Sequence, residues 1–335
     1  MQQPAVRALN HDANRNQSAD MLINMFDTAI DSDNIGDEII MDAVWSIARE
    51  IFPDATFITT PTHRYATPAE LLAGRRADLS IVGGTNILKP HMFYKGNWRI
   101  TPADLLAWRN VVLLGVGWRH YSGKPDIASR AFLRAVLSRN YLQSVRDGYT
   151  LGKLEDFLHN VIFTGCPTMW QLTDEACGRI PVRKAQHAMF TVTYYHPAPE
   201  QDKAVFDLLK KHYETVYIWA QQADDVGYIE KLDLEGFTWV DRTLKAYDTV
   251  LSEVDIDYVG TRLHGGIRAL QRGRRSAIIP VDNRATEIEK QTRLPIVQRS
   301  DPAAVERWIL DPVPTTLTMP WEDLTRWKAQ FGQAA

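Results

Sequence analysis

The strongest constraint on the fold is a regular alternation of short apolar runs with longer amphipathic segments, which begins at Met21. Such alternation is typical of a parallel β-sheet whose strands are joined by crossover helices. The clearest helical segment, Asp37 to Ile51, repeats apolar residues at steps of three and four. In the first half of the chain we expect strands at 22–26, 55–59, 79–83, 111–116, 141–145 and 161–164.

The alternation stops in a polar stretch, 172–186, and then starts again. We interpret this stretch as a linker between two Rossmann-like α/β domains, 21–171 and 187–300, that face each other across a cleft in a GT-B-like arrangement. Residues 1–20 are rich in Asn, Gln and Asp and predict a mobile tail. The last segment, 301–335, predicts helix that packs at the domain junction. The second domain is expected to have strands at 189–194, 216–220, 238–240, 258–261 and 277–281, and helices at 201–213 and 244–253.

Charge and cysteine content exclude several classes of protein. The 335 residues include 38 Lys and Arg against 41 Asp and Glu, a formal net charge of −3, so a broad positive field for nucleic acid is absent. Cys166 and Cys177 lack C-x-x-C spacing, which argues against a disulfide framework or a cysteine zinc site. No apolar run approaches the roughly 18 residues of a membrane span, and the N-terminus has no signal-peptide core. We therefore expect a cytoplasmic protein without a membrane span, and leave open whether it is a homo-oligomer.

The segment 257–275, DYVGTRLHGGIRALQRGRR, is the most informative for function. An apolar strand ends in Thr-Arg-Leu-His-Gly-Gly, and a helix is expected to start near Gly265. Ligands of α/β sheets bind at the carboxyl ends of strands, and the free N–H groups of a helix's first turn favour anions. Arg262 offers a planar fork for carboxylate or phosphate, and His264 can exchange a proton near neutral pH. The alternative is a glycine-rich turn with an incidental histidine and a basic surface helix.

Arginines are concentrated after this turn. Between 261 and 284 six arginines stand against one acidic residue, Asp282, which favours an anionic ligand. Helical spacing places Arg268 near the face of His264, because residues four apart are neighbours on a helix. Arg268 and Arg284 are therefore further candidates for the cleft.

Other turns that follow expected strands contribute candidates from the first domain. Arg146 could reach the cleft opposite Arg262, and the two could clamp a doubly anionic small molecule; pairing of Arg146 with Asp147 alone is the other interpretation. A capped helix start and a Gly-Gly turn also follow expected strand ends, although both features are common where no ligand binds. The residues of these two turns that we place in the cleft are Asn34, Gly36, Asp37, Gly84 and Asn86.

Motifs for metal or nucleotide chemistry are weak or missing. Asp31-Ser-Asp33 and Asp255-Ile-Asp257 match the D-x-D pattern of some metal-dependent glycosyltransferases, but two-residue matches arise often by chance. There is no H-E-x-x-H, no P-loop and no G-x-G-x-x-G after the first strand, so zinc hydrolase, NTPase and dinucleotide oxidoreductase functions lose their best support. We expect no metal site.

Six motifs lie in a fixed order along the chain: Asn34-Ile-Gly-Asp37, Gly83-Gly84, Gly115-Val-Gly117, Arg146-Asp147, Thr164-Gly-x-Pro167 and Gly260-Thr-Arg-Leu-His-Gly265. In order and spacing they resemble the polysaccharide pyruvyl transferase family, from about Leu22 to Val297. The resemblance implies a GT-B-like pair of domains and transfer of a pyruvyl group from phosphoenolpyruvate to two sugar hydroxyls as a cyclic ketal. It implies phosphoenolpyruvate as co-substrate, no other cofactor, and a saccharide or lipid-linked saccharide as acceptor.

The resemblance also implies roles for individual residues. Phosphoenolpyruvate is expected to contact Arg146, Arg262, the Leu263 backbone and Gly265, with His264 as general acid or base. Three positions depart from the family pattern: Thr85 stands for a third glycine, Cys166 for an acid and Arg284 for a lysine.

We expect the first domain to form the acceptor side and the second the donor side. The loop His91 to Arg99 supplies acceptor-side candidates, because Tyr94 and Trp98 could stack on a sugar ring beside His91; ordinary loop packing is the alternative. A GT-B glycosyltransferase that uses a nucleotide sugar, and a catalytically idle binding or scaffold member of the family, remain alternative functions.

Overall fold

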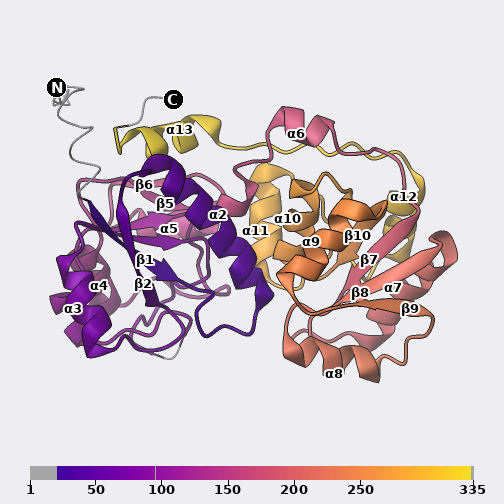
Figure 1. Ribbon diagram of the computed structural model, residues 1–335, viewed down its shortest axis with the longest axis horizontal. Helices are drawn as coiled ribbons and strands as arrows, with labels where there is room; N and C mark the ends of the chain where they lie inside the picture. Colours follow the sequence, from indigo (N-terminus) through magenta and orange to yellow (C-terminus); the bar gives the residue numbers. More distant parts are fainter. Residues whose placement is uncertain (1–20, 95, 333–335) are drawn as a thin grey trace.

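The computed structural model describes residues 21–94 and 96–332, and the tail predicted at 1–20 lies outside the described residues. Two parallel β-sheets form the centres of two α/β lobes that lie side by side (Figure 1). The predicted fold class, two Rossmann-like units in a GT-B-like pair, is confirmed. No helix in the described part of the chain is long and apolar enough to cross a bilayer.

The first sheet has the strand order β2-β1-β3-β4, and all neighbours are parallel. A two-stranded pair, β5 and β6, continues it, because Val116 at the end of β4 bridges to Val145. The central strands are buried along their whole length, as expected of a parallel sheet covered on both faces. The elements are β1 (Leu22–Asp27), α2 (Ile35–Ile51), β2 (Thr56–Pro61), α3 (Pro68–Arg76), β3 (Leu79–Gly83), the 3₁₀ turn η1 (Pro102–Leu106), β4 (Val111–Leu114), α4 (Ile127–Val136), β5 (Gln143–Val145), α5 (Gly148–Leu154), β6 (Val161–Phe163) and the 3₁₀ turn η2 (Pro167–Met169).

The second sheet has the order β11-β10-β7-β8-β9, again with parallel neighbours. Its strands and helices alternate as the sequence predicted, and the helix expected at 244–253 has those bounds. The expected linker at 172–186 contains a short helix, α6. The elements are α6 (Asp174–Gly178), β7 (His187–Thr191), α7 (Pro199–His212), β8 (Thr215–Trp219), α8 (Ala223–Lys231), β9 (Phe237–Val240), α9 (Leu244–Glu253), β10 (Ile256–Gly260), α10 (Leu263–Gln271), β11 (Ser276–Ile278), α11 (Asn283–Thr292), α12 (Pro302–Leu310) and α13 (Trp321–Ala329).

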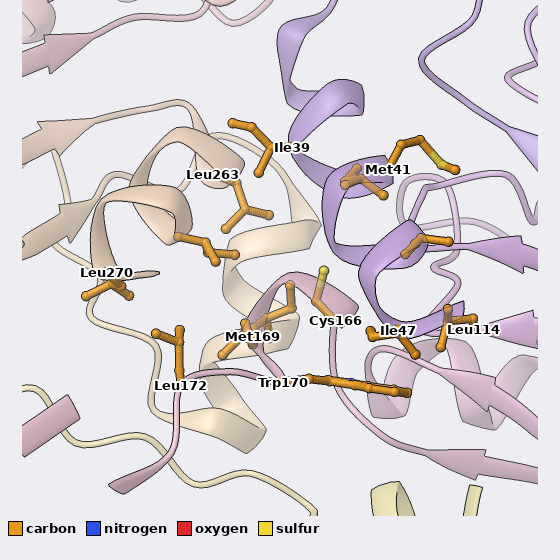
Figure 2. Close-up of a cluster of buried hydrophobic side chains, with 14 of the residues drawn as sticks. Ile39, Met41, Ile47, Leu114, Cys166, Met169, Trp170, Leu172, Leu263 and Leu270 are labelled. Atoms are coloured by element: carbon orange, nitrogen blue, oxygen red, sulfur yellow. The ribbon is translucent and has the colours of Figure 1, made fainter. Parts of the chain in front are cut away.

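One apolar core crosses the junction between the lobes. Side chains from α2, η2 and α10 gather in a single buried cluster, in which Ile39 of α2 and Leu263 of α10 both take part (Figure 2). The backbone is also joined there, because the Ile35 N–H donates to the Gln221 carbonyl at 3.0 Å. This shared core fixes the orientation of the two sheets, since separating them would expose apolar surface.

The C-terminal segment runs along both lobes. Helix α12 packs against α7 of the second lobe, and the chain then returns to the first lobe, where α13 lies (Figure 1). Trp327 is fully buried there, and its Nε1 donates to the Leu142 carbonyl at 3.0 Å. The segment therefore straps the two units together.

Candidate functional site

A cavity of about 680 Å³ lies between the two lobes. Its lining comes from loops that follow the carboxyl ends of strands in both sheets, the place where open α/β sheets bind ligands. The lining residues are Asp31, Ser32, Asp33, Asn34, Asp37, Ile40, His63, Thr85, Asn86, Asn97, Arg119, His120, Arg146, Tyr194, Tyr195, His196, Gln222, His264, Asp282 and Arg284.

Arg146 enters the cavity from the turn between β5 and α5. Its Nη2 donates to Asn86 Oδ1, and its Nε lies 3.3 Å from Asp147 Oδ2. Gly117 makes room for this side chain, because a Cβ at that position would clash with both Arg146 and Asn86. The side chain is 1% exposed, and its Nη1 has no hydrogen-bond partner among the described residues. One end of a buried guanidinium is thus left free to bind an anion.

Arg284 reaches the same cavity from the start of α11. It forms a two-point ion pair with Asp282, the N-cap of that helix, and its Nη2 donates to Tyr195 Oη at 2.6 Å. Burial by itself raises the pKa of Asp282, but the charge and hydrogen bonds of Arg284 lower it to about 2. Asp282 is therefore ionised, and Nη1 of Arg284 again lacks a partner within the described chain.

His264 lies in the first turn of α10 and is 3% exposed. Its Nε2 is 3.9 Å from Cys166 Sγ, and its Nδ1 has no partner in the part of the chain that the structure describes. Burial, followed by the charges of Arg284 and Arg146, lowers the pKa of His264 well below its ordinary value. The imidazole of the free protein is therefore neutral at physiological pH.

The order of motifs found in the sequence corresponds to a known family. The model of the polysaccharide pyruvyl transferase family matches residues 34–283, about three quarters of the chain. The chain belongs to this family. No curated protein matches it.

Among solved structures, this chain is similar to the UDP-GlcNAc 2-epimerase of Methanocaldococcus jannaschii, with a TM-score of 0.54 and 8% identity, covering 93% of this chain and 97% of that one. It also matches the MnaA–UDP structure from S. aureus, with a TM-score of 0.46 and 9% identity over 88% of this chain and 91% of that chain. At such identities the likeness concerns the fold alone. The epimerase match supports the GT-B-like arrangement of two parallel sheets.

Arg262 is placed differently from the expected clamp. Its Nε and Nη2 both donate to the fully buried Asp225, and its Nη1 donates to Gln222 at 2.7 Å. Arg262 is not among the described residues that line the cavity. The Arg262 fork is thus occupied within the fold, and it supports the turn before α10 instead of facing the cavity with Arg146.

The other donor-side candidates are Leu263 and Gly265, which offer backbone groups, and Arg268, which offers its side chain. The Leu263 side chain packs in the shared core, and the Gly265 carbonyl accepts from Tyr247 Oη at 2.8 Å. Helix α10 begins at Leu263, slightly before the expected start, so the amides of residues 263–265 have no acceptor inside the helix. Arg268 does not reach the cavity in the described structure, because it is held by Asp248 and Asp42 at the junction of α9, α10 and α2.

Of the candidates from the first-domain turns at 34–37 and 84–86, three line the described cavity, and the two glycines, Gly36 and Gly84, do not. Asn34 and Asp37 line the cavity, and Asn86 lines it beside Arg146. Gly36 abuts Gln221, so that a Cβ there would meet the Gln221 amide at 2.5 Å. Gly84 adopts a left-handed φ of 64° against Ile40, a conformation that favours glycine.

The three residues proposed from the expected acceptor loop do not line the described cavity, although Asn97 of the same loop does. Trp98 is fully buried against Phe26 and Trp108, so the expectation that it stacks on a sugar is wrong; aromatic character alone did not separate core from surface. His91 pairs with Asp126 at 2.7 Å, and Tyr94 is 74% exposed. Neither belongs to the described lining of the cavity, and their acceptor role stays a prediction.

Several lining residues were not predicted from the sequence. Arg119 and His120 follow β4, and His63 follows β2, so the rule that sites form at strand carboxyl ends could have found them. Tyr195 follows β7, so the same rule applies to it, but no local pattern predicts its hydrogen bond with Arg284, 89 residues away in sequence.

The three departures from the family pattern all lie at the site. Thr85 and Arg284 line the cavity. Cys166 is fully buried beside His264, and burial raises the pKa of its thiol, so the thiol is neutral. In this member the Nε2 side of His264 therefore has a neutral sulfur neighbour where the family pattern has an acid.

Proposed function

We propose that this chain transfers the pyruvyl group of phosphoenolpyruvate to two hydroxyls of a saccharide, forming a cyclic ketal and inorganic phosphate in the cavity between the lobes. The observation that carries the proposal is the trio Arg146, Arg284 and His264. Two arginines with one free nitrogen each act on one buried, neutral histidine. Family membership supplies the reaction class.

The two arginines suit the two charged ends of the donor. Phosphoenolpyruvate carries a carboxylate and a phosphate, and guanidinium groups bind both through charged hydrogen bonds. The amides at the start of α10 add donors and a favourable helix dipole, which supports the contacts expected at Leu263 and Gly265. Arg119, which also lines the cavity, adds a third positive charge.

His264 is proposed to move protons on the donor side. The reaction adds one proton to C3 of phosphoenolpyruvate, removes one from each acceptor hydroxyl, and releases phosphate from C2. A bound donor places negative charge beside His264 and offsets the two arginine charges that lower its pKa. Donor binding would thus prepare His264 to hold the proton that C3 or the leaving phosphate needs.

The test is phosphate release from phosphoenolpyruvate in the presence of a panel of saccharides and lipid-linked saccharides, with mass analysis of the acceptor. We expect phosphate and an acceptor that has gained one ketal-linked pyruvate. Phosphoenolpyruvate that neither binds nor reacts, together with turnover of a nucleotide sugar, would instead establish the glycosyltransferase alternative. Donor binding without turnover on any acceptor would favour the idle member.

The residue test is His264→Gln, which keeps a hydrogen-bonding amide but cannot transfer a proton at neutral pH. Turnover is expected to fall about 10²- to 10⁴-fold while the dissociation constant of the donor shifts only a few-fold. His212→Gln is the matched control, because His212 pairs with Glu306 on the outside of the second lobe. Near-native turnover of His264→Gln would remove the catalytic assignment.

A further inference from the structure

The lining of the cavity includes a second histidine, His63, next to a carboxylate. His63 follows β2, and its Nε2 lies 3.5 Å from Oδ2 of Asp37, in the first turn of α2. Ser32 Oγ donates to the same Oδ2 at 2.6 Å. All three residues line the cavity. This part of the lining therefore holds a His–Asp pair that faces the same space as His264.

Asp37 differs from two other carboxylates of the lining. Asp31 is paired with Arg64 at 2.9 Å, and Asp33 is paired with Arg242 at 3.0 Å. Asp37 is 6% exposed and has no Arg or Lys partner among the described residues; its charged neighbour is His63. No arginine or lysine of the described chain therefore competes with His63 for the Asp37 carboxylate, which accepts a hydrogen bond from Ser32.

The two nitrogens of His63 have different surroundings. Nε2 is buried, and its nearest acidic atom is Asp37 Oδ2. Nδ1 has no partner in the described structure, and the side chain keeps 22% exposure where it lines the cavity. Nε2 makes no hydrogen bond among the described residues, and Asp37 is the carboxylate near enough to accept a proton from it. A proton directed from Nε2 to Asp37 leaves the Nδ1 lone pair as the position that can take a proton.

We propose that His63 is the base that takes protons from the acceptor hydroxyls, and that Asp37 is its positioning residue. The inference rests on the proposed function, because it assigns the other half of the same reaction. As an acceptor oxygen bonds to C2 of the donor, its O–H bond breaks and the proton passes to His63. His264, which lines the same cavity, supplies the proton to C3 or to the departing phosphate. Two hydroxyl protons are lost, and His63 passes each to solvent before it takes the next. Two protons are gained, one at C3 and one by the phosphate whose bond to C2 breaks, so the reaction balances.

The division of labour has a simple electrostatic reason. A histidine held between Arg146 and Arg284 is surrounded by positive charge and lies next to the anionic donor. His63 has a carboxylate, not an arginine, as its charged neighbour, and its Nδ1 side lines the cavity where an acceptor hydroxyl can approach. Each histidine therefore has the surroundings that its half of the reaction requires.

The experiment compares His63→Gln, Asp37→Asn and His212→Gln with wild type in calorimetric titrations of phosphoenolpyruvate and in turnover on the acceptor found for the wild type. We expect unchanged donor affinity in all three. Turnover should fall about 10²- to 10⁴-fold in His63→Gln, at least about tenfold in Asp37→Asn, and not in His212→Gln. Added imidazole should restore part of the turnover of His63→Ala, which a merely structural role would not allow.

The outcomes separate this inference from the proposed function. If wild type binds phosphoenolpyruvate and turns over while His63→Gln keeps near-native turnover, the assignment of His63 is wrong and the proposed function stands. If wild type neither binds the donor nor releases phosphate, the proposed function itself fails. Donor affinity that falls in parallel with turnover in His63→Gln would show that His63 serves donor binding, which also overturns the assignment.

Discussion

Two turns of the molecule place an arginine just past the end of a buried strand, and they use it in different ways. Arg146 follows β5, and Arg262 follows β10; the two side chains are 1% and 3% exposed. The nitrogens of Arg262 are taken up by Asp225, Gln222 and the Val192 carbonyl. Arg146 keeps Nη1 free and lines the cavity.

The difference teaches that position and burial do not make an arginine a ligand-binding residue. What decides whether an arginine can bind a ligand is how many of its hydrogen-bond donors are already used by other residues of the protein. The neighbouring Asp147 is engaged mainly with α5, where its Oδ1 accepts from the Thr150 amide at 2.7 Å. By contrast Asp225 has both oxygens on Arg262. Arg262 thus belongs to an internal ion pair, and Arg146 is the arginine that we propose as a binding group.

The largest effect should come from breaking the internal pair. Arg262→Ala leaves the fully buried Asp225 without its cation, and removing one partner of a buried pair typically costs about 3–5 kcal/mol of unfolding free energy. Urea unfolding followed by circular dichroism measures this loss. Arg179→Ala, which breaks an exposed pair, is the control and should change stability by less than about 0.5 kcal/mol. If Arg262→Ala is as stable as wild type but no longer binds phosphoenolpyruvate, Arg262 is a binding residue and its contrast with Arg146 is wrong.

A smaller effect sharpens the contrast through pH. The folded-state pKa of His264 is lowered, so His264 favours folding above its ordinary pKa of 6.5, and that contribution is lost as the pH falls. Below pH 6.5 the unfolded chain binds one more proton at this site, which costs up to about 1.4 kcal/mol per pH unit. Between about pH 7.5 and about pH 5.5, the unfolding free energy should therefore fall more in wild type than in His264→Gln. Equal losses would show that burial and the two arginines do not lower the pKa of His264.

The fold could be predicted from local patterns. The apolar run before Gly260 and the spacing of Asp37 to Ile51 specify a buried parallel strand and an amphipathic helix, and both occur with small shifts in their ends. The helix α6 inside the expected linker was missed, because its five residues carry no amphipathic period.

The site could be predicted less completely, because long-range pairing is invisible in one sequence. The acid that occupies Arg262 lies 37 residues away on another element, and no local pattern announces it. Trp98 was predicted to stack on a sugar because its side chain is aromatic, whereas the aromatic cluster that buries it forms only in the folded protein. His264 was found because it lies just past a strand end, where a positional rule applies, and Arg284 because arginines are concentrated between 261 and 284.

The most direct measurement of the central claim is calorimetric titration of phosphoenolpyruvate into wild type, Arg146→Ala and Arg146→Lys in the presence of a metal chelator. We expect wild type to bind without added metal, and Arg146→Ala to lose about 1.5–3 kcal/mol of binding free energy, or roughly 10- to 150-fold in affinity. Arg146→Lys should recover only part, because lysine lacks the planar fork. Arg146→Ala that binds the donor as tightly as wild type, or wild type that binds only when magnesium is restored, would contradict the claim that arginines at this cavity hold the donor.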